Sequence, residues 1–123
     1  MATTDLTTDV FEQTVLGDGI VLVDWWADWC GPCKAFAPIY EAASEANPDI
    51  TFGKIDTETE QQLSASAGIT SIPTLMAFRD GVLVFAQPGA LPAPALNQVI
   101  DAVRELDMDK VHAEIAAQAE QKA

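Results

Sequence analysis

The apolar residues of the chain fall into continuous runs that alternate with segments of helical periodicity. Residues 7–16 have a polar start and one apolar side, which predicts a short helix that ends at Gly17. Residues 19–27 form a continuous apolar run, the pattern of a strand that is buried on both faces of a sheet. A helix is expected over residues 31–47 and a second strand over residues 49–57. This half of the chain therefore predicts a right-handed βαβ unit with parallel strands.

The second half of the chain shows a different order of elements. Residues 59–68 predict a short helix, which a loop follows. Residues 74–86 contain two apolar runs joined at Asp80-Gly81, the usual sign of a tight β-hairpin. Residues 91–106 predict an amphipathic helix with its apolar side inward. The whole pattern predicts an α/β fold, in which a parallel βαβ half and an antiparallel β-hairpin form one central mixed β-sheet with helices on both faces.

Three prolines define the long helix expected over residues 31–47. Pro32 suits its first turn, where the missing backbone N–H is not needed. Pro38 lies inside the helix and is expected to kink it, whereas Pro48 ends it.

The last residues of the chain carry a second helical pattern. Residues 107–123 are rich in alanine, glutamine and charged residues, which favour helix. A weakly apolar stripe in this segment consists of Met108, Val111 and Ile115. The stripe is out of phase with the inward side of the preceding helix, so we expect a bend near residues 106–109. The predicted organisation is a domain of residues 1–106 followed by a C-terminal helical extension of residues 107–123.

Composition and charge indicate the size of the protein and the kinds of molecule that it is not expected to bind. The 123 residues fit one domain, and 49% of them are hydrophobic, which is enough for a core. No apolar run is long enough to cross a membrane, and the N-terminus lacks the features of a secretory signal, so a cytoplasmic location is expected. The formal net charge of −13 would repel phosphate backbones and anionic lipids. We therefore expect neither a nucleic-acid nor a membrane partner.

The chain contains only two cysteines, Cys30 and Cys33, at the expected start of the long helix. A structural zinc site needs four ligands, and the single histidine, His112, lies far along the chain, so no metal is expected, a cluster shared between two chains being the one alternative. A static disulfide would close so short a loop that it would restrict the unfolded chain very little. In a reducing compartment such a pair is more often catalytic than structural. We therefore interpret the pair as a redox switch.

The position of each cysteine predicts its role. Residues three apart share one face of a helix, so the two sulfurs can meet at the first turn. Cys30 stands at the helix entrance, where free N–H groups and the helix dipole stabilise a thiolate. It is the expected nucleophile. Cys33 lies one step inward, is expected to be more buried, and is assigned the attack that resolves the mixed disulfide.

One acid, Asp24, interrupts the first apolar run. A carboxylate in a buried strand is costly, so its pKa should be raised. It precedes Cys30 by six residues, and the end of the strand can lie beneath the start of the helix. Asp24 is then suited to take the proton from Cys33, although it could also cap a helix or face water. Lys54, on the neighbouring strand, is either a residue that tunes Asp24 or an ordinary edge lysine.

Several strings of the sequence together resemble the thioredoxin family of bacteria. They are WADWCGPCKAFAP with VLVD before it, SIPT after a long gap, and PGA further on. The resemblance covers about residues 5–106. It implies a thioredoxin fold and a protein disulfide reductase, which works by thiol–disulfide exchange and maintains cellular redox homeostasis. It implies no bound cofactor, a redox-active disulfide, recharging by thioredoxin reductase with NADPH used only indirectly, client proteins with disulfides, and a monomer.

The resemblance also implies a substrate groove beside the cysteines. In the family the proline of the Ile72-Pro73-Thr74 segment is cis and packs against the active site. The residues expected to support the site or line the groove are Trp29, Gly31, Pro32, Ile72, Pro73, Thr74, Gly89 and Ala90. Trp25 stands where the family often has Phe or Tyr, which indicates an exchange within the core. Trp26 and Pro38 match structural positions, and Pro88 is less usual and is expected to stiffen the edge of the groove.

Two other functions compete with a general reductase. One is a specialised oxidoreductase with a single dedicated client, and the other is a non-catalytic binding subunit. The Cys-Gly-Pro-Cys spacer resembles the reductases of the family, because oxidases and isomerases usually carry a histidine between the cysteines. Intact Cys30, Cys33 and Asp24 argue against a purely structural role.

Overall fold

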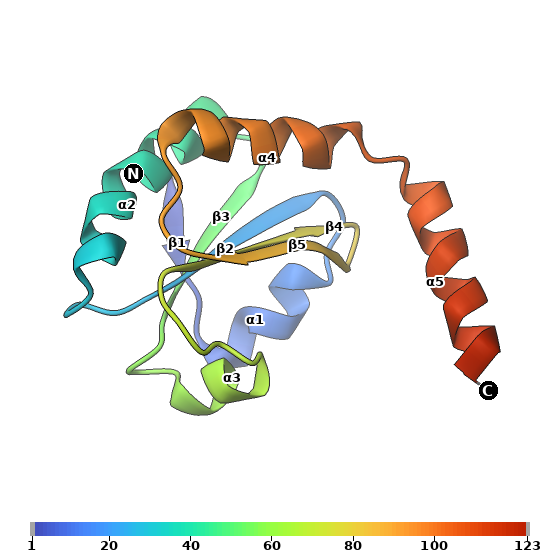
Figure 1. Ribbon diagram of the computed structural model, residues 1–123, viewed down its shortest axis with the longest axis horizontal. Helices are drawn as coiled ribbons and strands as arrows, with labels where there is room; N and C mark the ends of the chain where they lie inside the picture. The colour runs from blue at the N-terminus through green and yellow to red at the C-terminus, as the bar shows by residue number, and fades with distance from the viewer. Residues whose placement is uncertain (1, 123) are drawn as a thin grey trace.

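Residues 2–122, which the computed structural model describes, contain five strands and five helices (Figure 1). The strands are β1 (Thr3–Asp5), β2 (Ile20–Trp26), β3 (Thr51–Asp56), β4 (Thr74–Arg79) and β5 (Val82–Pro88). The helices are α1 (Thr8–Val15), α2 (Gly31–Ala46), α3 (Gln61–Ser66), α4 (Ala93–Glu105) and α5 (Met108–Lys122). The strands form one sheet in the order β1-β3-β2-β4-β5.

The sheet is mixed, as the sequence predicts. Its middle strand, β2, pairs in parallel with β3 and antiparallel with β4. The β2-α2-β3 segment is the predicted βαβ unit, and β4 and β5 form the predicted hairpin. Asp80 and Gly81 connect the hairpin, and both have positive φ angles of 50° and 82°. Two consecutive positive φ angles are what the tightest hairpin turns require, and they explain why glycine stands here.

Strand β1 is an element that the sequence pattern does not predict. Its three residues pair in parallel with β3 at the edge of the sheet. The start of the chain is tied to α2, because the N–H of Ala2 and the hydroxyl of Thr3 donate hydrogen bonds to the carboxylate of Glu41. At the other end of β1, the N–H of Leu6 donates to the carbonyl of Lys54. The strand is too short and too polar to show an apolar alternation.

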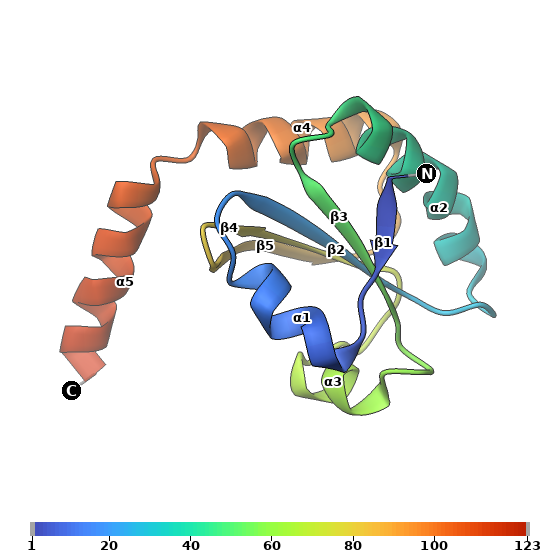
Figure 2. The same cartoon turned by 180° about the vertical axis from the view of Figure 1, so that it is seen from behind.

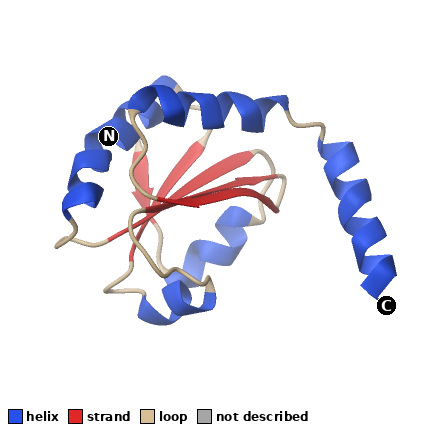
Figure 3. Cartoon of the chain, viewed as in Figure 1, coloured by secondary structure: helices blue, strands red, loops and turns tan. Residues whose placement is uncertain are grey.

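Helices cover both faces of the sheet (Figures 1, 2 and 3). Helices α2 and α4 lie on one face, and α1 and α3 lie on the other. The core beneath α2 and α4 includes Leu22, Phe36, Tyr40, Phe52, Leu75, Leu96 and Ile100. The core beneath α1 and α3 includes Val21, Val23, Trp25, Ile55 and Met76. Trp25 is fully buried with its ring 5.7 Å from that of Phe11, so the expected core role of Trp25 is confirmed.

The chain bends between α4 and α5, as the phase of the apolar stripe predicts. Helix α4 ends at Glu105 and α5 begins at Met108. The guanidinium of Arg79 donates hydrogen bonds of 2.7 to 3.0 Å to three carbonyl oxygens at the end of α4 and in the bend, those of Val103, Arg104 and Leu106. Beyond this point α5 extends away from the body of the sheet (Figure 2). Within residues 2–122, no helix has the length and apolar character that spanning a bilayer requires.

Candidate active site

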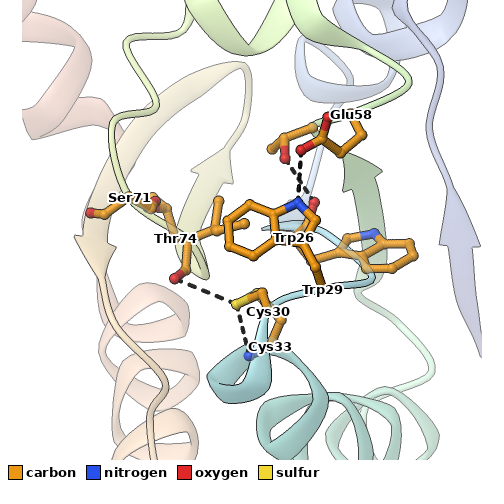
Figure 4. The surroundings of a disulfide bond; sticks show 9 residues. Trp26, Trp29, Cys30, Cys33, Glu58, Ser71 and Thr74 are labelled. Carbon is orange, nitrogen blue, oxygen red and sulfur yellow. Dashed lines mark hydrogen bonds between the residues drawn. A yellow bond between two sulfur atoms is a disulfide. The ribbon is translucent and has the colours of Figure 1, made fainter.

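A disulfide joins Cys30 to Cys33 at the start of α2 (Figure 4). Cys30 has an extended backbone, with φ −88° and ψ 110°, and caps the helix. Its Sγ accepts a hydrogen bond of 3.2 Å from the backbone N–H of Cys33. Pro32 occupies the first turn, where its missing N–H removes no helical hydrogen bond. Both sulfurs therefore lie at the positive end of the helix dipole, where the sequence places them.

The two cysteines are nearly equally buried. Their exposed fractions are 4% for Cys30 and 2% for Cys33, so the larger burial expected for Cys33 amounts to very little. The two cysteines differ more clearly in their access to a pocket of about 410 Å³. Cys30 lines this pocket and Cys33 does not. Gly31 and Pro32 border the same pocket. Of the two cysteines, Cys30 is therefore the one that borders the pocket.

Trp29 forms part of the rim of this pocket. Its side chain is 69% exposed, in agreement with a place on the surface and not in the core. Its Nε1–H donates a hydrogen bond of 2.7 Å to the carboxylate of Glu58, which follows β3 (Figure 4). Glu58 thus fixes the orientation of an exposed ring beside the pocket. The sequence pattern does not predict this role for Glu58.

The Ile72-Pro73 segment packs beside the cysteines. The peptide bond between these residues is cis, as the resemblance implies. The carbonyl oxygen of Ile72 lies 3.7 Å from the Sγ of Cys30. Ile72 lines the pocket with Trp29, whereas Pro73 is buried below the surface. The structure therefore brings the Ile-Pro segment next to Cys30, the expected nucleophile.

The other groove residues lie on either side of Pro73. Thr74 is buried, and its hydroxyl donates a hydrogen bond of 2.6 Å to the carbonyl of Ser71. The N–H of Gly89 donates a hydrogen bond of 2.8 Å to the carbonyl of Pro73, which joins the end of β5 to the active-site loop. Gly89 and Ala90 are exposed next to the pocket but do not line it. The residues expected to line the groove are thus divided, because some border the pocket at Cys30 while Gly89 and Ala90 lie on an exposed segment outside it.

Part of the pocket wall comes from residues that the sequence pattern did not single out. These residues are Thr57, Ser64, Ile69, Thr70 and Ser71. Thr70 and Ser71 directly precede the Ile-Pro segment, so their position in the chain could have predicted their place in the pocket wall. Thr57 directly follows β3 and Ser64 lies in α3, and only the folded chain brings them to the pocket.

Asp24 is buried in the middle of the sheet. Its side chain is 1% exposed, and neither carboxylate oxygen has a hydrogen-bond partner among residues 2–122. Burial raises the pKa of Asp24 to about 7, and the charge of Lys54 partly opposes this effect. A strand residue in this position does not face water and caps no helix, which removes the two alternatives to a buried acid. Asp24 can therefore gain or lose a proton near neutral pH.

Lys54 lies directly across from Asp24 in the paired strands β2 and β3. Its ammonium does not contact the carboxylate and instead lies 4.9 Å from the centre of the Trp26 ring. Strand β3 is flanked by β1 and β2, so Lys54 is not an edge lysine. It acts on Asp24 through its charge and not through a hydrogen bond.

Tyr40, on α2, is a second buried titratable group on this side of Asp24. Its hydroxyl donates a hydrogen bond of 2.8 Å to the carbonyl of Gly53. Burial, and to a smaller extent the charge of Asp24, raises the pKa of Tyr40 well above its usual range. Tyr40 therefore stays protonated while Asp24 titrates.

The arrangement combines a reversible disulfide with a buried acid. When the disulfide is reduced, the hydrogen bond from the Cys33 N–H and the helix dipole favour a thiolate at Cys30. Cys33 lies on the inner side of α2, which packs on the sheet face that carries Asp24. Among the described residues, no group of histidine, cysteine, aspartate and glutamate side chains forms a metal site. The chemistry that these groups support is thiol–disulfide exchange.

Comparisons with known proteins agree with this chemistry. The Thioredoxin family model matches residues 2–102. The chain is 56% identical over 117 residues to a putative thioredoxin 2 of Streptomyces coelicolor, a match that covers 95% of this chain and 87% of that protein. It is 40% identical over 102 residues to thioredoxin 1 of a Nostoc species, covering 81% of this chain and 95% of that protein.

Solved structures give the same result. The structure of Plasmodium falciparum thioredoxin is similar to this chain with a TM-score of 0.75 and 33% identity, over 81% of this chain and 98% of that one. The thioredoxin Mala s 13 of Malassezia sympodialis has a TM-score of 0.74 and 32% identity, over 81% of this chain and 89% of that one. The match to the Streptomyces protein covers nearly the whole chain, so it extends into α5.

Proposed function

The chain belongs to the thioredoxin family, and we propose that it acts as a general protein disulfide reductase that thioredoxin reductase recharges with electrons from NADPH. Members of this family are disulfide oxidoreductases that use a redox-active disulfide and no bound cofactor. The observation that carries the proposal is the Cys30–Cys33 disulfide at the start of α2, with Cys30 lining an open pocket.

The proposed reaction has two exchange steps. The Cys30 thiolate attacks one sulfur of a client disulfide, forms a mixed disulfide and releases the other client sulfur as a thiolate. The Cys33 thiolate then attacks the sulfur of Cys30, which closes the Cys30–Cys33 disulfide and releases the second client sulfur. Two electrons and two protons pass from the protein to the client. Thioredoxin reductase returns them to the cysteines.

Asp24 has a proposed part in the second step. Cys33 must lose a proton before it attacks, and a base works best when its pKa is close to the working pH. A buried carboxyl with a pKa of about 7 meets this condition. We assign Asp24 the acceptance of the Cys33 proton and Lys54 the electrostatic adjustment of Asp24. The burial of Asp24 supports its assignment as the base, and its register with Lys54 in the paired strands supports the assignment of Lys54.

Client recognition is proposed to use the pocket at Cys30 and the exposed edge beside it. Trp29 and Ile72 supply apolar surface next to the sulfur, and Gly89 and Ala90 leave an open edge along which an extended client segment can lie. Pro73 and Thr74 are buried and hold the shape of this groove. Pro88 ends β5 at the same place, which supports its expected stiffening of the groove edge.

The remaining features of the proposal concern the cellular setting. A cysteine pair that must return to the dithiol state suits the reducing cytoplasm. The net charge of −13 favours neither nucleic acid nor anionic membranes as partners. We propose a monomer that maintains redox homeostasis by serving several client proteins.

Reduction of insulin tests the function. The oxidised protein is mixed with NADPH, a bacterial thioredoxin reductase and insulin, and the loss of NADPH absorbance and the precipitation of the insulin B chain are followed together. A general reductase turns over many times. If the reductase reduces the protein but insulin remains intact, a dedicated client replaces the general role. If a chemical dithiol reduces the protein but the reductase does not, the proposed electron source is wrong.

A further inference from the structure

The ammonium of Lys54 lies over the ring of Trp26, although Lys54 is in register with the buried acid Asp24. Registered residues of parallel strands, and residues two apart within a strand, point to the same face of a sheet. Asp24, Trp26 and Lys54 therefore share the sheet face that α2 covers. The Lys54 Nζ is 4.9 Å from the ring centre, within the range of a cation–π interaction.

This position needs a physical reason. A lysine has a flexible stem of four carbons, and an ion pair with a neighbouring carboxylate is the usual result. Yet neither oxygen of Asp24 finds a hydrogen-bond partner in the part of the chain that the structure describes. The face of an indole attracts a cation because the π electrons make it negative. The ring of Trp26 therefore competes with Asp24 for the ammonium of Lys54.

We propose that Trp26 is a positioning residue whose ring holds the Lys54 ammonium away from Asp24 and so leaves the carboxylate free to accept the proton of Cys33. This proposal rests on the proposed role of Asp24 as a base. An ion pair with Lys54 would stabilise the ionised carboxylate and weaken it as a base. An ammonium held nearby, but out of contact, lowers the proton affinity of the carboxylate only in part.

From β3, two charged residues share the sheet face of Asp24: Lys54, in register with Asp24, and Asp56, in register with Trp26. On β4 the residue in register with Asp24 is the uncharged Leu75. From α2, the titratable groups on this side are Tyr40, which remains protonated, and the cysteines. In the oxidised protein the cysteines form a disulfide and do not titrate. In the oxidised form the cysteines therefore do not contribute to the titration of Asp24, and the comparison with Lys54→Met isolates the effect of Lys54.

The experiment measures the titration of Asp24 itself. The carboxyl carbon of Asp24 is followed by ¹³C NMR from pH 4 to pH 10 in the oxidised full-length protein. The variants are Trp26→Leu, Trp26→Phe, Lys54→Met and the double variant Trp26→Leu/Lys54→Met. Circular dichroism and the dispersion of the amide signals confirm that each variant is folded. Trp26→Phe keeps an aromatic face and is the conservative control.

The proposal predicts a pattern and not a single shift. In Trp26→Leu the ammonium is released to Asp24, so the titration midpoint falls by about 1 pH unit. Trp26→Phe stays closer to the wild type, because a phenyl ring also attracts a cation. Lys54→Met raises the midpoint, and adding Trp26→Leu to Lys54→Met produces no fall. In the reduced protein, the midpoint of the pH dependence of mixed-disulfide resolution should move to lower pH in the single variant Trp26→Leu. It should not do so in the double variant Trp26→Leu/Lys54→Met.

Two outcomes would overturn the proposal. The first is an unchanged or higher midpoint in a folded Trp26→Leu variant. The second is an equal fall in the Lys54→Met background, which would show that Trp26 acts on Asp24 without Lys54. The titration does not depend on activity. If Asp24→Asn resolves mixed disulfides at the wild-type rate, the role of Asp24 as a base fails while the effect of Trp26 on Lys54 can still be measured.

Discussion

The backbone N–H of Cys33 donates a hydrogen bond of 3.2 Å to the Sγ of Cys30. The sulfur that receives this hydrogen bond is also the one that lines the pocket. A negative charge on Cys30 would thus be stabilised at the pocket where we propose that a client disulfide binds. The two cysteines are alike in burial, so this hydrogen bond and the pocket, and not a difference in exposure, support their separate roles.

These roles predict different outcomes for the two cysteine variants. Cys30→Ser should abolish disulfide reduction, because the remaining thiol does not line the pocket. Cys33→Ser should instead accumulate a mixed disulfide between Cys30 and a client, because nothing resolves it. Mass spectrometry of the trapped adducts distinguishes the two variants. Adducts on Cys33 in the Cys30→Ser protein, at comparable yield, would reverse the assignment.

The burial of Asp24 predicts that replacing it stabilises the protein at high pH. Its pKa is about 7 in the folded protein and about 3.9 in the unfolded chain. Between these values the folded state holds a proton that the unfolded state has lost, so the stability that the neutral group contributes falls as the pH rises through this window. Asp24→Asn carries no charge and should be more stable at pH 8, by about 2–4 kcal/mol.

Denaturant unfolding at several pH values measures this effect. The advantage of Asp24→Asn over the wild type should shrink between pH 8 and pH 4, where the wild-type carboxyl is protonated in the folded state. Asp28→Asn, at an exposed position a few residues away, is the matched control and should show no comparable trend. A less stable Asp24→Asn protein at pH 8 would contradict a buried carboxylate without partners.

The same variant should be slow in catalysis for a different reason. Asp24→Asn removes the proposed acceptor of the Cys33 proton, so the second exchange step should slow by about 10²–10⁴-fold. The first step depends on Cys30 and should change little. Rapid-mixing experiments with a disulfide peptide separate the two steps, because the mixed disulfide should persist longer in Asp24→Asn. Equal rates of resolution in the two proteins would remove Asp24 from the mechanism.

Much of the site could be predicted because its signals are local in the sequence. The spacing of Cys30 and Cys33, and the acid within an apolar run, are visible without a structure. Glu58 was not visible, because its contact with Trp29 joins residues 29 positions apart and nothing local marks it. The contact of Lys54 with Trp26 was not predictable either. The neighbouring strands put Lys54 near Asp24, but nothing in the local sequence indicates that its ammonium lies over the Trp26 ring.

The fold shows the same division between local and distant signals. The apolar run of β2 and the Asp80-Gly81 turn are recognisable from their own residues, and both elements were predicted. Strand β1 depends on its pairing with β3 and on Glu41, so its three polar residues alone do not indicate a strand. The cis bond before Pro73 came from the family resemblance, because only about 5–6% of such bonds in folded proteins are cis.

The C-terminal helix makes limited contact with the rest of the protein. Met108 is buried at 8% exposure, whereas Ile115 is 45% exposed. Val111 and Ile115 border a pocket of about 260 Å³ against the start of β5. Arg79 fixes the chain only as far as Leu106. Figure 1 shows α5 beside the turn between β4 and β5, while the start of α2, which carries the cysteines, lies at the opposite side of the sheet.

We therefore expect deletion of residues 108–123 to leave insulin reduction nearly unchanged. The deletion removes mainly the apolar packing of Met108 and Val111, so the free energy of unfolding should fall by no more than about 1–2 kcal/mol. The competing view is that the stripe on α5 docks on the domain or on a second chain and completes a functional surface. Turnover, denaturant unfolding and size-exclusion chromatography of the truncated protein separate the two views. A large loss of turnover, or a dimer that becomes a monomer, would show that α5 belongs to the working protein.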